Sequence, residues 1–171
     1  MINFMVLGGQ RSGTTWLANL LTTDTTLCLH DPLLEYTPNQ LDRSVVPGYR
    51  LGISCTASLL FNEWVQKHPA KKVLIYRDPE EINASCRALG LLEIDVSKQF
   101  ALLGNVEAPI FHWDHMFKPS GAEEICEILG VPFCKYRHFE LRKMNIQPCW
   151  DKLDVSKEAV QNLARRIQEV L

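Results

Sequence analysis

Residues 4–16, which read FMVLGGQRSGTTW, constrain the fold of this chain more strongly than any other segment. The run begins with four apolar residues and two glycines, and after a short loop Trp16, Leu17, Leu20 and Leu21 recur at helical spacing. It therefore predicts a buried strand that enters a glycine-rich turn and a helix that leaves it. Glycines let the backbone approach a ligand closely, and the N–H groups at the start of a helix attract an anion.

The rest of the chain repeats this order of strand and helix. Apolar runs predict strands over residues 2–8, 26–30, 49–54, 71–77 and 108–117. Helical spacing and end signals predict helices over residues 13–23, 57–68, 79–90, 120–130 and 157–171. This alternation predicts an α/β fold, a P-loop-like three-layer sandwich with a central, mostly parallel sheet flanked by helices. We expect a single domain over residues 1–171, with an irregular excursion at residues 35–50.

Ligands of such sheets bind beyond the carboxyl ends of the strands. The predicted strands would bring residues 8–15, the pair His30 and Asp31, and Arg77 to one edge, although they lie far apart in the sequence. The fold prediction thus also predicts where a functional site should lie.

Composition narrows the class of protein. A formal net charge of −2 argues against a protein that coats nucleic acid, which needs an excess of basic residues on one face. The sequence has no run of about eighteen apolar residues, and only three residues precede the first apolar strand. We therefore expect no membrane segment and a cytoplasmic location.

Cysteine and histidine spacing gives no metal signature. The six cysteines form no C-x-x-C pair, and we expect them to be small buried residues without disulfides; they are at positions 28, 55, 86, 126, 134 and 149. Alternation within the predicted strand 108–117 explains His112 and His115 without a metal ion. The prediction is that the protein uses no metal.

The loop departs from the usual phosphate-binding pattern at one position. In the pattern G-x-x-x-x-G-K-[ST], Gly8, Gly13 and Thr15 fall where they are needed, but Thr14 replaces the lysine. A positive charge lies three residues upstream instead, at Arg11, whose forked guanidinium suits phosphate oxygens. In nucleoside triphosphate enzymes the lysine reaches the outer phosphates. Its loss therefore favours a ligand other than a nucleoside triphosphate with magnesium.

Two motifs together resemble the sulfotransferase family. The segment GGQRSGTTWL is similar to that family's 5′-phosphosulfate loop, and YRDPEEINASCR is similar to its second signature, an Arg-(Asp/Asn)-Pro strand end followed by a serine. Here the second motif supplies Arg77, Asp78, Pro79 and Ser85. Finding both motifs in the family's order is a stronger signal than either one alone. The length fits a compact, bacterial- or phage-like member.

The resemblance implies a donor, 3′-phosphoadenosine 5′-phosphosulfate, and no metal. It implies that Arg77 and Ser85 contact the 3′-phosphate, and that the 5′-phosphosulfate is bound by the loop residues Gly9, Gln10, Arg11, Ser12, Gly13, Thr14 and Thr15. The acceptor would be a small molecule or a glycan that offers a hydroxyl or an amine. The sequence does not specify the acceptor or the oligomeric state.

The resemblance also points to a catalytic base. Some family members carry a carboxylate followed by proline after the second strand, and Asp31 and Pro32 fall near that position. Asp31 is the first choice for accepting the acceptor proton, His30 and Glu35 are rivals, and Arg11 would stabilise the leaving phosphate.

Two other classes of function stay open from the sequence. A nucleoside or nucleotide kinase with an altered loop would require magnesium, and Asp31 or Asp78 would serve as the metal's carboxylate. A noncatalytic nucleotide-binding module would bind the nucleotide without turnover.

Overall fold

A computed structural model describes residues 1–93 and 95–144. Its sheet has five strands, and every neighbouring pair is parallel, in the order β2-β3-β1-β4-β5. The strands are β1 (Phe4–Gly8), β2 (Thr26–His30), β3 (Arg50–Cys55), β4 (Lys71–Tyr76) and β5 (Ile110–His112). The prediction of an α/β, P-loop-like three-layer sandwich is confirmed.

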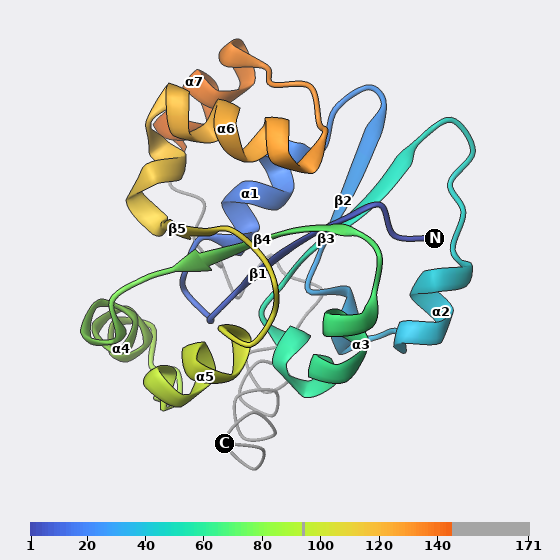
Figure 1. Ribbon diagram of the computed structural model, residues 1–171. Helices are drawn as coiled ribbons and strands as arrows, with labels where there is room; N and C mark the ends of the chain where they lie inside the picture. Colours follow the sequence, from blue (N-terminus) through green and yellow to red (C-terminus); the bar gives the residue numbers. More distant parts are fainter. Residues whose placement is uncertain (94, 145–171) are drawn as a thin grey trace.

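Helices cover the sheet on both faces (Figure 1). The α-helices are α1 (Thr14–Leu21), α2 (Pro38–Arg43), α3 (Asn62–Lys67), α4 (Pro79–Ala88), α5 (Val96–Leu103), α6 (Pro119–Leu129) and α7 (Lys135–Lys143). Three short 3₁₀ helices complete the described chain: η1 (Pro32–Leu34), η2 (Ala57–Phe61) and η3 (Trp113–Phe117).

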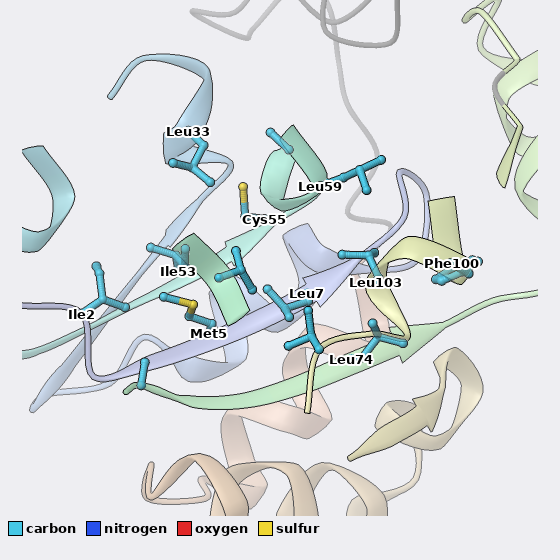
Figure 2. Close-up of a cluster of buried hydrophobic side chains, with 14 of the residues drawn as sticks. Ile2, Met5, Leu7, Leu33, Ile53, Cys55, Leu59, Leu74, Phe100 and Leu103 are labelled. Atoms are coloured by element: carbon cyan, nitrogen blue, oxygen red, sulfur yellow. The ribbon is translucent and has the colours of Figure 1, made fainter. Parts of the chain in front are cut away.

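Each face of the sheet has its own apolar core. Residues of α1, α6 and α7 pack on one face, and residues of η1, α2, η2, α3, α4 and α5 pack on the other. Figure 2 shows the second core, where Met5 and Leu7 of β1 meet Ile53, Leu74 and Leu103. Because β1 is central and covered on both sides, all five of its residues are buried. This explains why it reads as a continuous apolar run.

The first strands follow the sequence prediction closely, but the last one does not. Residues 108–117 were predicted as one strand, and only Ile110–His112 pair with β4 before the chain turns into η3. The alternation expected for His112 and His115 is therefore wrong. His112 bonds to Asp114 and His115 bonds to Glu124, so each side chain has its own surface partner.

Two other segments differ from prediction for local reasons. Residues 35–50 contain α2, which begins with Pro38 and a capping box between Thr37 and Gln40, a start signal that outweighs the turn-rich composition. The helix predicted over 57–68 is divided into η2 and α3 at Phe61. Helices α5 and α7 were not predicted, and the predicted helix 157–171 lies outside the described residues.

Most cysteines are placed as expected. Cys28, Cys55, Cys86 and Cys126 are buried, free thiols, and burial raises the pKa of Cys126 to about 12. Cys134 is a correction, because it is exposed at the start of α7, where its sulfur accepts the Arg137 N–H. Cys149 lies outside the described residues.

Candidate active site

The loop after β1 has the shape that its glycines predict. Gly13 adopts a left-handed conformation (φ 93°) as the N-cap of α1, and a Cβ there would lie 2.1 Å from Cε of Met116. Arg11 is also left-handed (φ 63°), which is uncommon for a residue with a side chain. The Ser12 hydroxyl donates to the Gly9 carbonyl at 2.6 Å and closes the turn. The chain therefore adopts a compact, strained loop at the carboxyl end of β1.

The start of α1 is open toward the loop. No side chain caps its N-terminus, and its first turn carries no acidic residue. The N–H groups of a helix's first turn have no partner within the helix, and the helix dipole makes this end attractive to anions. The loop and the start of α1 therefore have a geometry that suits an anion.

The two arginines and the serine of the predicted motifs come together. Nε of Arg11 donates to Oγ of Ser85 at 3.0 Å, and one terminal nitrogen of Arg77 donates to the Arg11 carbonyl at 2.7 Å. Ser85 lies on α4, the helix that follows β4 and Arg77 in the chain. Residues separated by more than 60 positions are therefore joined in one chain of hydrogen bonds, Ser85–Arg11–Arg77.

Further contacts position each arginine. Arg77 donates from Nε to Glu81 at 3.0 Å, and its guanidinium carbon lies 4.0 Å from the ring centroid of Trp113. Burial lowers the pKa of the Arg11 guanidinium; the neighbouring Cys86 raises it and Arg77 lowers it further. A guanidinium group is not deprotonated in proteins. Two fixed cations therefore lie beside the loop.

A cavity of about 180 Å³ opens between the loop, η3 and the end of α7. It is lined by Arg11, Gly13, Thr14, Thr15, Trp16, Arg77, Trp113, Phe117, Leu141, Arg142 and Met144. Three arginines and three aromatic rings share this wall, a combination that suits a phosphorylated aromatic ligand. Of the predicted residues, Arg11, Gly13, Thr14, Thr15 and Arg77 line the cavity.

Three residues that line the cavity were not predicted from the sequence: Trp113, Arg142 and Phe117. Trp113 was not among the predicted site residues; it packs, partly buried, against the core and also stacks on Arg77. Arg142 carried no signal, because it belongs to α7, which was not predicted. Phe117 was assigned to a strand, whereas η3 places it at the cavity.

His30 and Asp31 lie at the end of β2, next to the start of α1. Nε2 of His30 is 3.0 Å from the Thr15 hydroxyl, 3.4 Å from the Thr14 hydroxyl and 3.3 Å from Oδ2 of Asp31. The other carboxylate oxygen of Asp31 accepts the hydroxyl of Thr56 at 2.9 Å and also the Thr56 backbone N–H. The rival Glu35 is exposed at the end of η1.

Asp31 has an unusual backbone that these bonds explain. Its φ is 46°, in the left-handed region, which aspartate tolerates better than most residues. The two bonds from Thr56, at the end of β3, tie the carboxylate to the neighbouring strand. Asp31 is therefore a fixed partner for the imidazole, and His30, whose side chain is 36% exposed, is the more accessible of the two.

Gln10 and Gly9, two of the predicted loop residues, contact the neighbouring helices and do not line the cavity. Gln10 is buried, and its Nε2 donates to the sulfur of Cys86 at 3.4 Å and to the Leu92 carbonyl at 3.3 Å. Gly9 packs against α5, where a Cβ would lie 3.1 Å from Oε1 of Gln99. These residues contribute backbone to the loop, and their surroundings hold it against α4 and α5.

Residues 1–93 and 95–144 contain neither a cluster of metal-ligating side chains nor a membrane-spanning helix. No group of three histidine, cysteine, aspartate or glutamate side chains there is placed to hold a metal ion. None of the helices in this part of the chain is long and apolar enough to cross a bilayer.

The described chain is a three-layer α/β protein with a glycine-rich loop after its central strand, a fold that it shares with a sulfotransferase of known structure. No family model matches the sequence, and no curated protein does. Among solved structures the chain is similar to mouse sulfotransferase SULT7A1 complexed with PAP, with a TM-score of 0.57. That match covers 99% of this chain and 75% of the mouse chain at 13% identity, so it shows the shared fold.

Proposed function

We propose that this protein is a sulfotransferase that moves a sulfuryl group from 3′-phosphoadenosine 5′-phosphosulfate to a hydroxyl or amine of a small molecule or glycan. The observation that carries the proposal is the bonded chain Ser85–Arg11–Arg77, which joins the loop to a second cationic position beside one cavity. A ligand with two separate phosphate positions on one nucleoside matches this arrangement. The mouse neighbour's complex with PAP, which is 3′,5′-adenosine bisphosphate, supports the same reading.

In this proposal the donor extends across the edge of the sheet. The 5′-phosphosulfate lies on the loop backbone of Gly9 to Gly13 and the start of α1, where Ser12, Thr14 and Thr15 contribute hydroxyls or backbone N–H groups. The 3′-phosphate is bound by Arg77 and Ser85 through charge-assisted hydrogen bonds. The nucleoside fills the cavity beside Trp113, whose ring already stacks on a guanidinium and would also suit a base.

The chemistry is an in-line transfer. A lone pair of the acceptor oxygen or nitrogen forms a bond to sulfur, and the bond between sulfur and the bridging phosphate oxygen breaks with its electron pair remaining on the phosphate. Negative charge therefore develops on the 5′-phosphate, where Arg11 and the loop N–H groups stabilise it. Because a sulfuryl donor has no triphosphate to neutralise, the proposal needs neither the missing lysine nor a metal ion.

The acceptor proton goes to the pair formed by His30 and Asp31. His30 faces the hydroxyls of Thr14 and Thr15, so its imidazole lies next to the loop that holds the transferring group. Asp31, fixed by Thr56, orients the ring and stabilises the imidazolium that forms. This division of roles follows the contacts: the His30 imidazole faces the two hydroxyls, whereas the Asp31 carboxylate is already bonded to Thr56.

The proposal is tested by turnover of the donor with a panel of hydroxyl and amine acceptors, following formation of 3′,5′-adenosine bisphosphate. His30→Ala and Asp31→Asn should each lower the transfer rate by about 10²- to 10⁴-fold, because each disables the proton-accepting pair. Donor affinity should change much less than the rate, since the donor is proposed to lie on the loop, Arg77 and Ser85 and not on either of these two side chains. Asparagine tolerates the left-handed backbone at position 31 and can still accept from Thr56.

Full transfer activity in both variants would remove the pair from the mechanism. Turnover of ATP that requires magnesium, with no turnover of the sulfuryl donor, would replace the proposal by a kinase. Binding of the donor without turnover across the panel would favour a noncatalytic nucleotide-binding module.

A further inference from the structure

Gln99 is a buried side chain with unsatisfied polar atoms beside the loop. It lies on α5, its exposed fraction is 0%, and within residues 1–93 and 95–144 neither its Oε1 nor its Nε2 has a hydrogen-bond partner. Oε1 is the atom closest to the position that a Cβ of Gly9 would take, at 3.1 Å. The amide thus packs against the first residue of the loop, on the face of the sheet opposite α1.

The packing of α5 does not require an amide side chain at position 99. Its buried neighbours on the helix are Val96, Phe100 and Leu103, and the last two are seen in the apolar core of Figure 2. Burying an amide without partners costs free energy, because hydrogen bonds to water are lost and not replaced. A methionine of similar length would fill the space without that cost. The glutamine therefore requires an explanation outside core packing.

Gln10 provides an internal comparison. It is a buried glutamine of the loop itself, and its Nε2 donates to Cys86 and Leu92. One buried amide thus belongs to the loop and is bonded, and the other packs against the loop and is not. The difference indicates that Gln10 stabilises the loop as it stands in this structure, whereas Gln99 has the capacity to stabilise a different arrangement of it.

Ligand binding would compete with hydrogen bonds that hold the loop in this structure. Arg11 donates to Ser85, and the Arg11 carbonyl accepts from Arg77, so the groups proposed to bind phosphates are bonded to one another. A phosphate on either arginine competes for these donors, and an anion on the loop draws its N–H groups toward it. Breaking the bond from Arg77 to the Arg11 carbonyl frees the loop backbone two residues from Gly9. A peptide group and a side-chain amide are complementary, because each offers one acceptor and N–H donors.

We propose that Gln99 is a positioning residue for the loop: its amide hydrogen-bonds to the loop backbone at Gly9 and Gln10 when an anion occupies the loop. The inference rests on the proposed function only in taking the loop to hold phosphate or phosphosulfate. It assigns to α5 a role in donor affinity, although no residue of α5 lines the cavity.

The test compares Gln99→Met with Gln10→Met. Urea unfolding without added ligand measures stability, and calorimetric titration with inorganic pyrophosphate and with 3′,5′-adenosine bisphosphate measures affinity. For Gln99→Met we expect an unfolding midpoint equal to or above that of the wild type, and affinity for both ligands lower by about 3- to 10-fold, the effect of one lost neutral hydrogen bond. For Gln10→Met we expect a lower unfolding midpoint, because a bonded amide is lost.

A second measurement reports on Gln99 directly. The side-chain NH₂ signals of Gln99 in the wild-type protein should shift when pyrophosphate is added, because the amide gains a partner. Unmoved signals, or an affinity of Gln99→Met within twofold of the wild type, would show that Gln99 is only an unsatisfied core residue. A lower midpoint without ligand in Gln99→Met would also overturn the inference, since the amide would then have a partner already.

The outcomes separate this inference from the proposed function. If the wild type binds pyrophosphate but not the bisphosphate, the sulfotransferase proposal fails while the pyrophosphate affinities still decide the role of Gln99. If the wild type binds neither ligand, both proposals fail.

Discussion

Arg77 has three different contacts in this structure, and they make it the most informative single residue of the site. It bonds to the Arg11 carbonyl, pairs with Glu81 and stacks on Trp113, so its position is fixed before any ligand is considered. A side chain that is already ordered loses little rotamer freedom when it binds a phosphate. This fixed position would favour the proposed binding of a 3′-phosphate by Arg77.

Replacing Arg77 by alanine should affect two nucleotides differently. We expect affinity for 3′,5′-adenosine bisphosphate to fall by about 10- to 100-fold, because a charge-assisted hydrogen bond contributes about 1.5 to 3 kcal/mol. Affinity for AMP, which lacks the 3′-phosphate, should change much less. Calorimetric titration of both ligands measures the difference.

Arg87→Ala is the matched control for this experiment. Arg87 lies on the same helix as Ser85 but is exposed and pairs with Glu93 on the surface. Its loss should leave both affinities unchanged. An equal loss of AMP and bisphosphate affinity in Arg77→Ala would show that Arg77 acts on the loop as a whole and does not hold the 3′-phosphate.

Individual residues were predictable from sequence where a local motif fixed their surroundings. The loop glycines, Arg11, Arg77 and Ser85 belong to two short motifs, and the structure brings them together at one strand edge as the parallel fold requires. Gln99, Trp113 and Arg142 were not predictable, because their position depends on how α5, η3 and α7 pack. Their roles, like those of the motif residues, stay proposals until they are tested.

At the scale of elements, α7 connects the cavity wall to the core through a buried histidine. Nε2 of His138 donates to the Met116 carbonyl at 3.1 Å, and the His138 ring lies edge-on to Trp16 at 5.5 Å between centroids. Met116 in turn packs against Gly13, and the Leu141 carbonyl accepts the indole N–H of Trp16. Docking of α7 therefore includes the hydrogen bond from His138 to the Met116 carbonyl and the bond from Trp16 to the Leu141 carbonyl.

This contact predicts a pH dependence of stability. Burial lowers the pKa of His138; its bond to Met116 raises it and Arg142 lowers it further. Because the folded pKa lies below the unfolded value of about 6.5, the unfolded chain binds more protons below that pH. The free energy of unfolding should fall as pH drops below about 6.5, by at most about 1.4 kcal/mol per pH unit for this group.

The measurement is urea unfolding of the wild type and of His138→Gln between pH 8 and pH 5. Glutamine can donate to Met116 but does not titrate in this range, so the variant should lose less stability on acidification. Carboxylates titrate in both proteins and cancel in the comparison. Parallel stability curves for the two proteins would mean that His138 does not carry this proton linkage.

Elements with strong local signals were predictable, and those defined by neighbours were not. Strand β1 is buried on both sides and reads as an apolar run, and α4 begins with Asp78 and Pro79 as a helix start should. Helix α7 has charged and aromatic residues around most of its surface, with only His138 and Leu141 buried, so its sequence lacks a clear apolar stripe. The short strand β5 ends where Trp113 turns toward Arg77, a tertiary contact that no local pattern encodes.

At the scale of the whole molecule, the sheet order explains how distant motifs form one site. Strands β3 and β4 flank β1, and β2 and β5 lie outside them, so His30, the loop, Arg77 and Trp113 follow one another along one edge. The proposed nucleotide lies toward β4 and β5, and the proposed proton acceptor lies toward β2. The sulfuryl group would therefore be transferred near β1, where the loop and α1 concentrate positive potential.

Two fixed phosphate positions, built from protein groups alone, are proposed to select a nucleoside 3′,5′-bisphosphate. Calorimetric titration of the wild type with 3′,5′-adenosine bisphosphate in the presence of EDTA, beside AMP with EDTA and ATP with magnesium, tests this claim most directly. We predict that the bisphosphate binds without a metal ion and more tightly than either other nucleotide. Tighter binding of ATP with magnesium, or no binding of the bisphosphate, would contradict the account.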